Sequence, residues 1–194
     1  MATQDKNILC KKLDFKVDNM DNDVIVKFII DEFKKSNKKE IIVVNIGTDK
    51  CTGDSFAPFL GSYMEDNKFS IPFYGTLEDP IHALNIHKRI REIEDIHKNA
   101  FIIALDSSMS SSDKVGNITV RNKPVEAGAG LDKDLPSVGD VSIIYNVVGL
   151  NSGFVGIKNV RLGFILKAVR EVYKAFEILE SAYKGSEEYF IKAI

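Results

Sequence analysis

The sequence predicts an α/β protein, a three-layer α/β/α sandwich. Its sheet is expected to be mostly parallel, and a mixed sheet with an antiparallel strand is left open. Three apolar runs rich in β-branched residues, at 41–46, 101–105 and 141–148, are shorter than typical helices and lack polar alternation. Such runs are typical of strands buried on both faces. Helical segments separate the first two runs and another follows the third, and this alternation requires right-handed crossovers between parallel strands.

A helix is predicted ahead of the first strand. Asp23 precedes an apolar segment at 24–33, which closes in four lysines between 34 and 39. Cations are favourable at the carboxyl end of a helix, so this cluster is interpreted as a solvated helix end. Residues 1–20 carry no comparable pattern and are expected to form a flexible N-terminus.

Two more helices are predicted between the first two strands. A short one is expected at 54–64, after a glycine-containing loop. Asp79 followed by Pro80 has the residues of a helix cap and first helical position, which predicts a helix over 81–98. The intervening segment 69–74 is predicted to be an edge strand or a loop, because a proline interrupts it.

The second half of the chain completes a single domain over residues 1–194. The elements expected there are a serine-rich loop at 107–112, a hairpin over 118–126, a glycine- and proline-rich loop at 127–140 and a helix over 159–183. The helix has an apolar stripe that either packs on the sheet or pairs with a second subunit, which leaves a homo-oligomer open. Gly185 is expected to end it, so that 185–194 form a short tail.

Composition excludes several classes of function. The chain has 194 residues with 26 basic and 28 acidic side chains, for a net charge of −2, whereas a nucleic-acid binder would carry a basic excess. No apolar run approaches the roughly 20 residues that cross a bilayer, and the polar N-terminus lacks a secretory signal. Two cysteines suit a reducing compartment. We therefore expect a cytoplasmic protein that binds neither nucleic acid nor membrane.

Two aspartates at strand ends form the candidate catalytic pair. Asp106 directly follows the strand at 101–105, and Asp54 lies in the turn after the strand at 41–46. Binding crevices form outside the carboxyl ends of parallel strands. Two carboxyl groups held close share a proton, so one can activate water while the other protonates a leaving group. The structural alternative is that Asp54 stabilises a helix dipole and Asp106 caps the following loop.

Cofactor chemistry finds less support. The glycines between 47 and 53 lack the lysine of a phosphate-binding loop, so nucleotide binding is not expected and no cofactor is predicted. A metal ion held by Asp54, Asp106 and one histidine remains an open alternative.

Five blocks of residues between positions 41 and 166 carry a family resemblance. They are Ile46-Gly47-Thr48-Asp49 with Thr52-Gly53-Asp54, Tyr74-Gly75-Thr76-Leu77-Glu78-Asp79-Pro80-Ile81-His82-Ala83-Leu84-Asn85, Ala104-Leu105-Asp106, Lys123-Pro124 with Gly128-Ala129-Gly130, and Leu135-Pro136-Ser137-Val138-Gly139-Asp140. In this order they resemble the YyaC-like sporulation proteins. That family is related to the germination protease of spore-forming bacteria and, more distantly, to hydrogenase maturation endopeptidases, which implies a phosphorylase/hydrolase-like α/β/α fold.

The resemblance selects the same two acids as the strand-end argument. The germination protease carries its catalytic aspartates in a Thr-Pro-Asp and an Ile-Asp-Ala element, and Thr52-Gly53-Asp54 and Leu105-Asp106-Ser107 occupy the matching places here. This implies an aspartic-type endopeptidase that acts on a protein or peptide, such as a spore protein, in the cytoplasm of a sporulating cell or spore. In the maturation endopeptidases the corresponding acids help to bind a metal, which implies Asp54 and Asp106 as the alternative metal ligands. Gly53 departs from the proline of the germination protease.

Four further residues are candidates for substrate binding or for the shell around the acids: Asn45, Thr48, Asp49 and Gly128. A glycine at 128 would let a peptide backbone approach the crevice closely. The rival interpretation is a non-catalytic sporulation protein that binds a peptide or partner in the same crevice.

Overall fold

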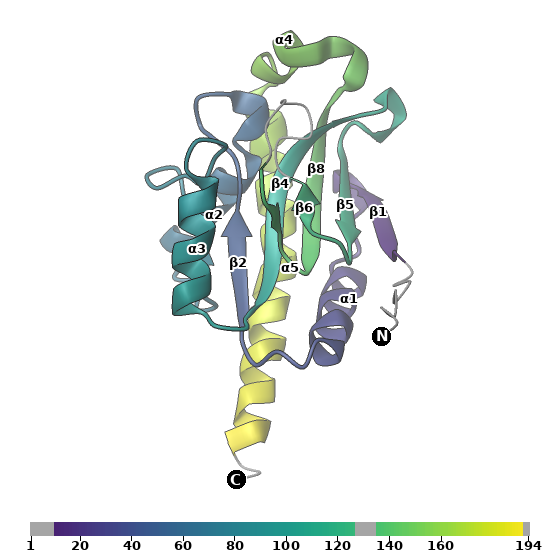
Figure 1. The fold of residues 1–194 in the computed structure, drawn as a ribbon. Helices are drawn as coiled ribbons and strands as arrows, with labels where there is room; N and C mark the ends of the chain where they lie inside the picture. The colour runs from purple at the N-terminus through teal and green to yellow at the C-terminus, as the bar shows by residue number, and fades with distance from the viewer. Residues whose placement is uncertain (1–9, 127–134, 192–194) are drawn as a thin grey trace, which may run out of the picture.

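The computed structural model describes residues 10–126 and 135–191 (Figure 1). The strands are β1 (Lys12–Lys16), β2 (Ile41–Asn45), β3 (Phe73–Tyr74), β4 (Phe101–Ser110), β5 (Asn117–Arg121), β6 (Val125–Glu126), β7 (Ser137–Val138) and β8 (Val141–Gly149). The α-helices are α1 (Asn22–Lys35), α2 (Phe56–Asp66), α3 (Ile86–Ile96), α4 (Gly153–Lys158) and α5 (Leu162–Ile191). Short 3-10 turns are η1 (Val17–Asn19), η2 (Thr52–Asp54), η3 (Ser112–Lys114) and η4 (Leu150–Ser152).

Six strands form one mixed sheet in the order β1-β5-β8-β4-β2-β3. Strands β3, β2, β4 and β8 run parallel to one another, whereas β5 runs antiparallel to both β8 and β1. β2 and β4 pair in register from Ile41 opposite Phe101 to Asn45 opposite Leu105. β4 then continues to Ser110, so Asp106 lies within this strand and not directly after it as predicted. The predicted mostly parallel, mixed α/β sheet is confirmed.

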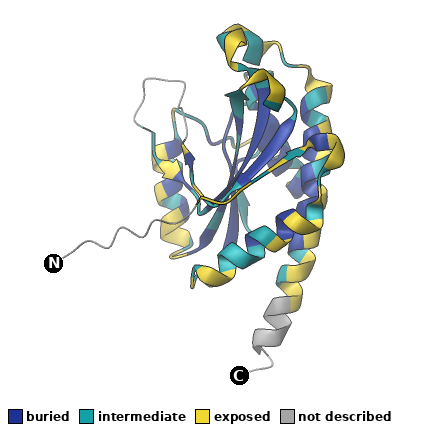
Figure 2. Ribbon diagram, turned by 90° about the vertical axis from the view of Figure 1, so that its right-hand side faces the viewer, coloured by how far each residue is buried: buried dark blue, intermediate teal, exposed yellow. Residues whose placement is uncertain are grey.

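Helices cover the two faces of the sheet unequally (Figure 1). α1, α2 and α5 pack on one face, where the alternate residues Ile41 and Val43 of β2 belong to the larger core. α3 and the small β6-β7 pair pack on the other face with Ile42 and Val44, in a smaller core that contains no residue of β1 or β5. Figure 2 shows the strands mostly buried and the exposed residues on the outer sides of the helices. No helix of the described residues therefore covers the part of the second face formed by β5 and β1.

The helix expected over 81–98 begins five residues later than predicted, at Ile86. Ile81 is drawn into the sheet instead, where it bridges to Ile46 and its carbonyl accepts a hydrogen bond from Gly47 N at 2.8 Å. The side chain of Asn85 then bonds back to the preceding turn, accepting from His82 N and donating to the carbonyl of Pro80. These contacts with distant and neighbouring backbone outweigh the local cap signal.

The serine-rich loop and the hairpin were both wrong predictions. β4 continues through the serines to Ser110 because the long strand β8 pairs with it, with an irregularity between Ser108 and Met109. β5 pairs with β8 and β1, and β6 pairs with β7, so 118–126 does not fold on itself. In each case a partner far along the chain decides the pairing, and a local pattern does not show it.

The two ends of the chain hold more regular structure than expected. Within 1–20, the segment Lys12–Lys16 forms the edge strand β1 on β5. At the other end, α5 passes through Gly185 to Ile191, where a short tail was expected, since an exposed glycine costs a helix only about 1 kcal/mol. α4 occupies 153–158, so the long helix starts at Leu162. None of the helices in the described ranges is long and apolar enough to cross a bilayer.

Gly75 sets how closely the end of β2 approaches its neighbours. Its φ is +86°, and a Cβ there would lie 2.1 Å from the carbonyl oxygen of Asn45. A Cβ on Gly61 of α2 would in turn lie 2.0 Å from the carbonyl oxygen of Gly75. Glycine at these positions lets α2 and the segment after β3 pack directly on the strand end that precedes the candidate site.

We predict that Gly75→Ala lowers the free energy of unfolding by at least about 1 to 3 kcal/mol, because alanine would be strained at this φ and would overlap the backbone. Chemical denaturation measures the change. Gly185→Ala is the matched control: that glycine is exposed in α5 with open space around it, so alanine should stabilise slightly. Equal effects of the two substitutions would contradict the packing described here.

Candidate active site

Asp106 lies on the sheet face that the helices leave partly uncovered. It follows Leu105, which faces the larger core, so its own side chain faces the other way, next to Ile144 of β8. The same row continues to Thr119 of β5. The carboxyl group accepts a hydrogen bond from the backbone N–H of Ser107 at 2.7 Å. Asp106 is therefore fixed on a row of side chains that crosses the sheet.

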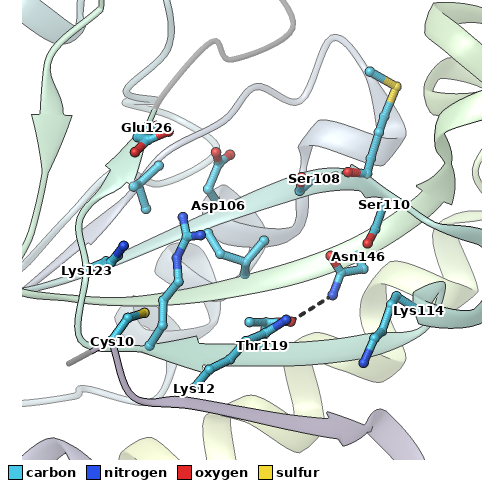
Figure 3. Close-up of a pocket in the computed structure, with 14 residues that line it drawn as sticks. Cys10, Lys12, Asp106, Ser108, Ser110, Lys114, Thr119, Lys123, Glu126 and Asn146 are labelled. Carbon is cyan, nitrogen blue, oxygen red and sulfur yellow. Dashed lines mark hydrogen bonds between the residues drawn. The ribbon is translucent and has the colours of Figure 1, made fainter.

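A pocket of about 400 Å³ opens on this face (Figure 3). The residues that line it are Cys10, Lys12, Asp106, Ser108, Met109, Ser110, Lys114, Thr119, Arg121, Lys123, Val125, Glu126, Ile144 and Asn146. Its floor is a hydrogen-bonded polar layer: Asn146 donates to the Thr119 hydroxyl at 3.0 Å, drawn as a dashed line in Figure 3, and Thr119 donates to Asp14. A cavity with a polar, fixed floor suits a polar ligand such as a peptide.

Asp54 is held by the turn that joins β2 to α2. Its carbonyl accepts a hydrogen bond from Thr48 N at 3.0 Å, and its own N–H donates to the carbonyl of Cys51 at 2.9 Å. Gly53 lies against α4, since a Cβ there would be 2.4 Å from the carbonyl oxygen of Ile157. This contact favours glycine at position 53, because α4 packs on the turn at that point.

Burial raises the pKa of both acids. The pKa of Asp54 is raised to about 7 by burial, which a hydrogen bond from the backbone of Thr48 offsets only in part. Burial also raises the pKa of Asp106 well above its ordinary value, and the negative charge of Asp54 raises it further, while Ser107 N–H and the charge of Arg121 lower it. Burial therefore favours the protonated form of both carboxyl groups, and Asp54 titrates near neutral pH.

The two aspartates come to the same edge of the sheet, although fifty-two positions separate them. η2, which ends in Asp54, contacts β4, and the charge of Asp54 acts on Asp106. The pocket wall includes Asp106 and not Asp54 in the part of the chain described.

The other expected site residues fall in different places. Thr48 closes its loop on Asp54, while Asp49 is exposed and accepts a hydrogen bond from the Thr48 hydroxyl at 3.4 Å. Asn45 is fully buried toward α2 and donates to the carbonyl of Tyr74, on the opposite side of the sheet from the pocket. Gly128 lies outside the described residues.

The family model described as "Protein of unknown function (DUF1256)" matches residues 14–175. The chain belongs to this family. The uncharacterized protein YyaC of Bacillus subtilis (strain 168) is 42% identical over 138 residues, which is 69% of this chain and 66%, just under two thirds, of that relative's length. These findings confirm the resemblance to YyaC-like proteins.

A solved structure shares the fold of this DUF1256 chain. The [NiFe] hydrogenase maturation protease HycI from Thermococcus kodakarensis KOD1 superposes with a TM-score of 0.52 at 14% sequence identity, over 78% of this chain and 99% of that one. At this identity the likeness establishes the α/β architecture alone.

The DUF1256 chain does not assemble a full set of metal ligands in residues 10–126 and 135–191. No three His, Cys, Asp or Glu side chains come together there in a way that could hold a metal ion. His97 is engaged elsewhere, hydrogen-bonded to the Tyr74 hydroxyl at 2.6 Å and to Glu40 at 2.9 Å. Protein sites for transition metals ordinarily use at least three side-chain ligands, so two aspartates alone do not fit one.

Sequence reasoning missed the polar floor of the pocket. Asn117, Thr119 and Arg121 alternate with the apolar residues of β5, a two-residue period that marks a strand with one polar face. The predicted hairpin concealed this signal, because it paired the strand with its own continuation. Lys12 was missed for a related reason, since β1 was expected to be part of a flexible end.

We predict that Asp54→Asn stabilises the protein at alkaline pH. The folded pKa is raised to about 7, so the wild-type protein loses stability as pH rises from the unfolded value toward and through 7. Asparagine removes this ionisation and should raise the free energy of unfolding at about pH 8 by up to about 4 kcal/mol, with little difference near pH 4. Urea denaturation across this range measures it.

Asp49→Asn is the matched control, because Asp49 is exposed in the same connection between β2 and α2. It should keep the pH dependence of the wild-type protein. An Asp54→Asn protein that is no more stable than wild type at alkaline pH would show that Asp54 is not held in a desolvated position.

Proposed function

We propose that this chain is an endopeptidase in which Asp54 and Asp106 activate water against a peptide bond. The observation that carries the proposal is the pair itself: one carboxyl group from η2 and one from β4, both with a raised pKa, one responding to the charge of the other. A structural acid that only caps a loop or helix would have its ionised form favoured, and its pKa would be lowered.

The different environments of the two acids assign their roles. Asp54, whose pKa lies near neutrality, serves as the base: its carboxylate takes a proton from water while the water oxygen attacks the carbonyl carbon of the peptide. Asp106, whose protonated form is favoured by burial and by the charge of Asp54, donates its proton to the carbonyl oxygen, which gives a neutral tetrahedral intermediate. The proton on Asp54 then passes to the amide nitrogen, the C–N bond breaks, and Asp106 recovers its proton from the intermediate.

The pocket and the family favour a polypeptide substrate. The polar floor offers hydrogen bonds to a peptide, and Val125 and Ile144 add apolar surface in its wall. Membership of the family that includes YyaC favours a substrate found in sporulating cells, such as a spore protein, and a cytoplasmic site of action. The structural neighbour is named as a protease, which by analogy supports cleavage of peptide bonds by a protein of this fold.

One observation favours a second function, peptide binding without cleavage. Asp106 lines the pocket, whereas Asp54 does not line it in the described part of the chain. A ligand could then occupy the pocket and contact Asp106 without meeting a water molecule activated by Asp54.

Cleavage of proteins in an extract of sporulating cells, followed by mass spectrometry of new termini, separates these functions. We predict that the wild-type protein produces new termini and that Asp54→Asn and Asp106→Asn each lower their rate of formation by about 10² to 10⁴-fold, as expected for loss of a general acid or base. Circular dichroism confirms that both variants are folded.

The control variant is Asp113→Asn, which removes an exposed carboxyl group from η3 outside the pocket lining and should cleave like wild type. Identical sets of termini from wild type and both active-site variants would refute the peptidase proposal and support peptide binding.

A further inference from the structure

Arg121 occupies a fixed position in the pocket that the proposed mechanism does not use. It is the last residue of β5, two positions from Thr119 and on the same sheet face as Asp106. Its Nε donates to the hydroxyl of Ser142 at 3.0 Å, and its Nη2 donates to the carbonyl of Pro124 at 3.4 Å. Ser142 is fully buried on β8, the strand between β5 and β4. The guanidinium group therefore reaches across β8, toward the strand that carries Asp106.

Within residues 10–126 and 135–191, Arg121 has no ion-pair partner. Two other cations of the pocket, Lys12 and Lys114, both lie within 3.1 Å of the carboxylate of Asp14. No carboxylate of the described residues lies within ion-pair distance of Arg121. Its positive charge does lower the pKa of Asp106. A half-buried guanidinium without a carboxylate partner is a binding site for one, since burial strengthens its attraction for a negative charge.

The geometry of the anchored group suits a carboxylate. A guanidinium group has five N–H donors in one plane, and the bonds to Ser142 and Pro124 use two of them. The remaining donors can make the paired hydrogen bonds that arginine forms with carboxylates. The two bonds to the protein fix the plane of the group before a ligand arrives, which lowers the entropy cost of binding.

We propose that Arg121 is a specificity-determining residue that binds a carboxylate group of the peptide substrate in the pocket beside Asp106. The proposal rests on the peptidase function proposed above and deepens it, because it specifies an acidic group near the bond that is cleaved. The carboxylate is either an acidic side chain or the carboxyl terminus of the substrate, and both would present the same two oxygens to Arg121.

Small carboxylates test this site without any cleavage. N-acetylglutamate α-amide carries a side-chain carboxylate alone, N-acetylalanine carries a terminal carboxylate alone, and N-acetylglutamine α-amide carries neither. Each is titrated into the wild-type protein while the Nε–H signal of Arg121 is followed by NMR. We expect at least one carboxylate to shift this signal and to bind about tenfold more tightly than the neutral amide. The carboxylate that does so identifies the source.

Two variants and a control make the result specific. Arg121→Met should abolish the preference for the carboxylate over the amide, and Arg121→Lys, which keeps the charge without the planar fork, should retain only part of it. Lys16→Met removes one exposed positive charge from β1, outside the pocket lining, and should leave the preference intact.

Equal binding of carboxylates and amide, no detectable binding of either carboxylate, or an undiminished preference in Arg121→Met would overturn the assignment. Since the titration needs no turnover, its outcome is independent of the cleavage experiment. Carboxylate binding at Arg121 in a protein that cleaves nothing would leave this site standing and refute the peptidase alone.

Discussion

The register between β2 and β4 is the constraint on which the candidate site depends. The two strands pair residue for residue as far as Asn45 and Leu105, and the bond from Ile46 N to the carbonyl of Leu105 at 2.9 Å extends the pairing past the end of β2. The chain after β2 therefore leaves the sheet beside Asp106, while β4 continues along β8 to Ser110. A slip of one residue would turn Asp106 to the opposite face, among the apolar side chains of the larger core.

The helices cover the two faces of the sheet unequally, and this difference explains the raised pKa values of Asp54 and Asp106. Three helices pack on one face and exclude water there, while the other face, away from α3, is floored by polar side chains that bond to one another. Acids placed at the boundary lose water without gaining a close cationic partner, so their protonated forms are favoured. Stability at neutral pH is reduced by the same burial that makes the two carboxyl groups useful for proton transfer.

The parts of the fold that could be predicted are those whose signal lies within the element itself. The β-branched runs of β2, β4 and β8 are dictated by burial on both faces, and their order predicted that Asp54 and Asp106 belong to neighbouring strands. Asp106 lies within β4 and not after it, because pairing with β8 extends the strand through the serines. β1 and β5 pair across more than a hundred positions, and the start of α3 depends on the bridge from Ile81 to Ile46. No local propensity contains such contacts. The sequence did not single out Arg121, because its place in the pocket depends on the pairing of β5 with β8.

Carbon-13 NMR titration of the carboxyl groups of Asp54 and Asp106, in wild-type protein and in each Asn variant, tests most directly whether these side chains form one site. Both carboxyl groups are expected to titrate above the ordinary aspartate range in the wild-type protein, and Asp54→Asn is expected to lower the pKa of Asp106, because the neighbouring negative charge is gone. Ordinary pKa values for both groups, or a pKa of Asp106 that is unchanged in Asp54→Asn, would show that the two side chains do not form one site.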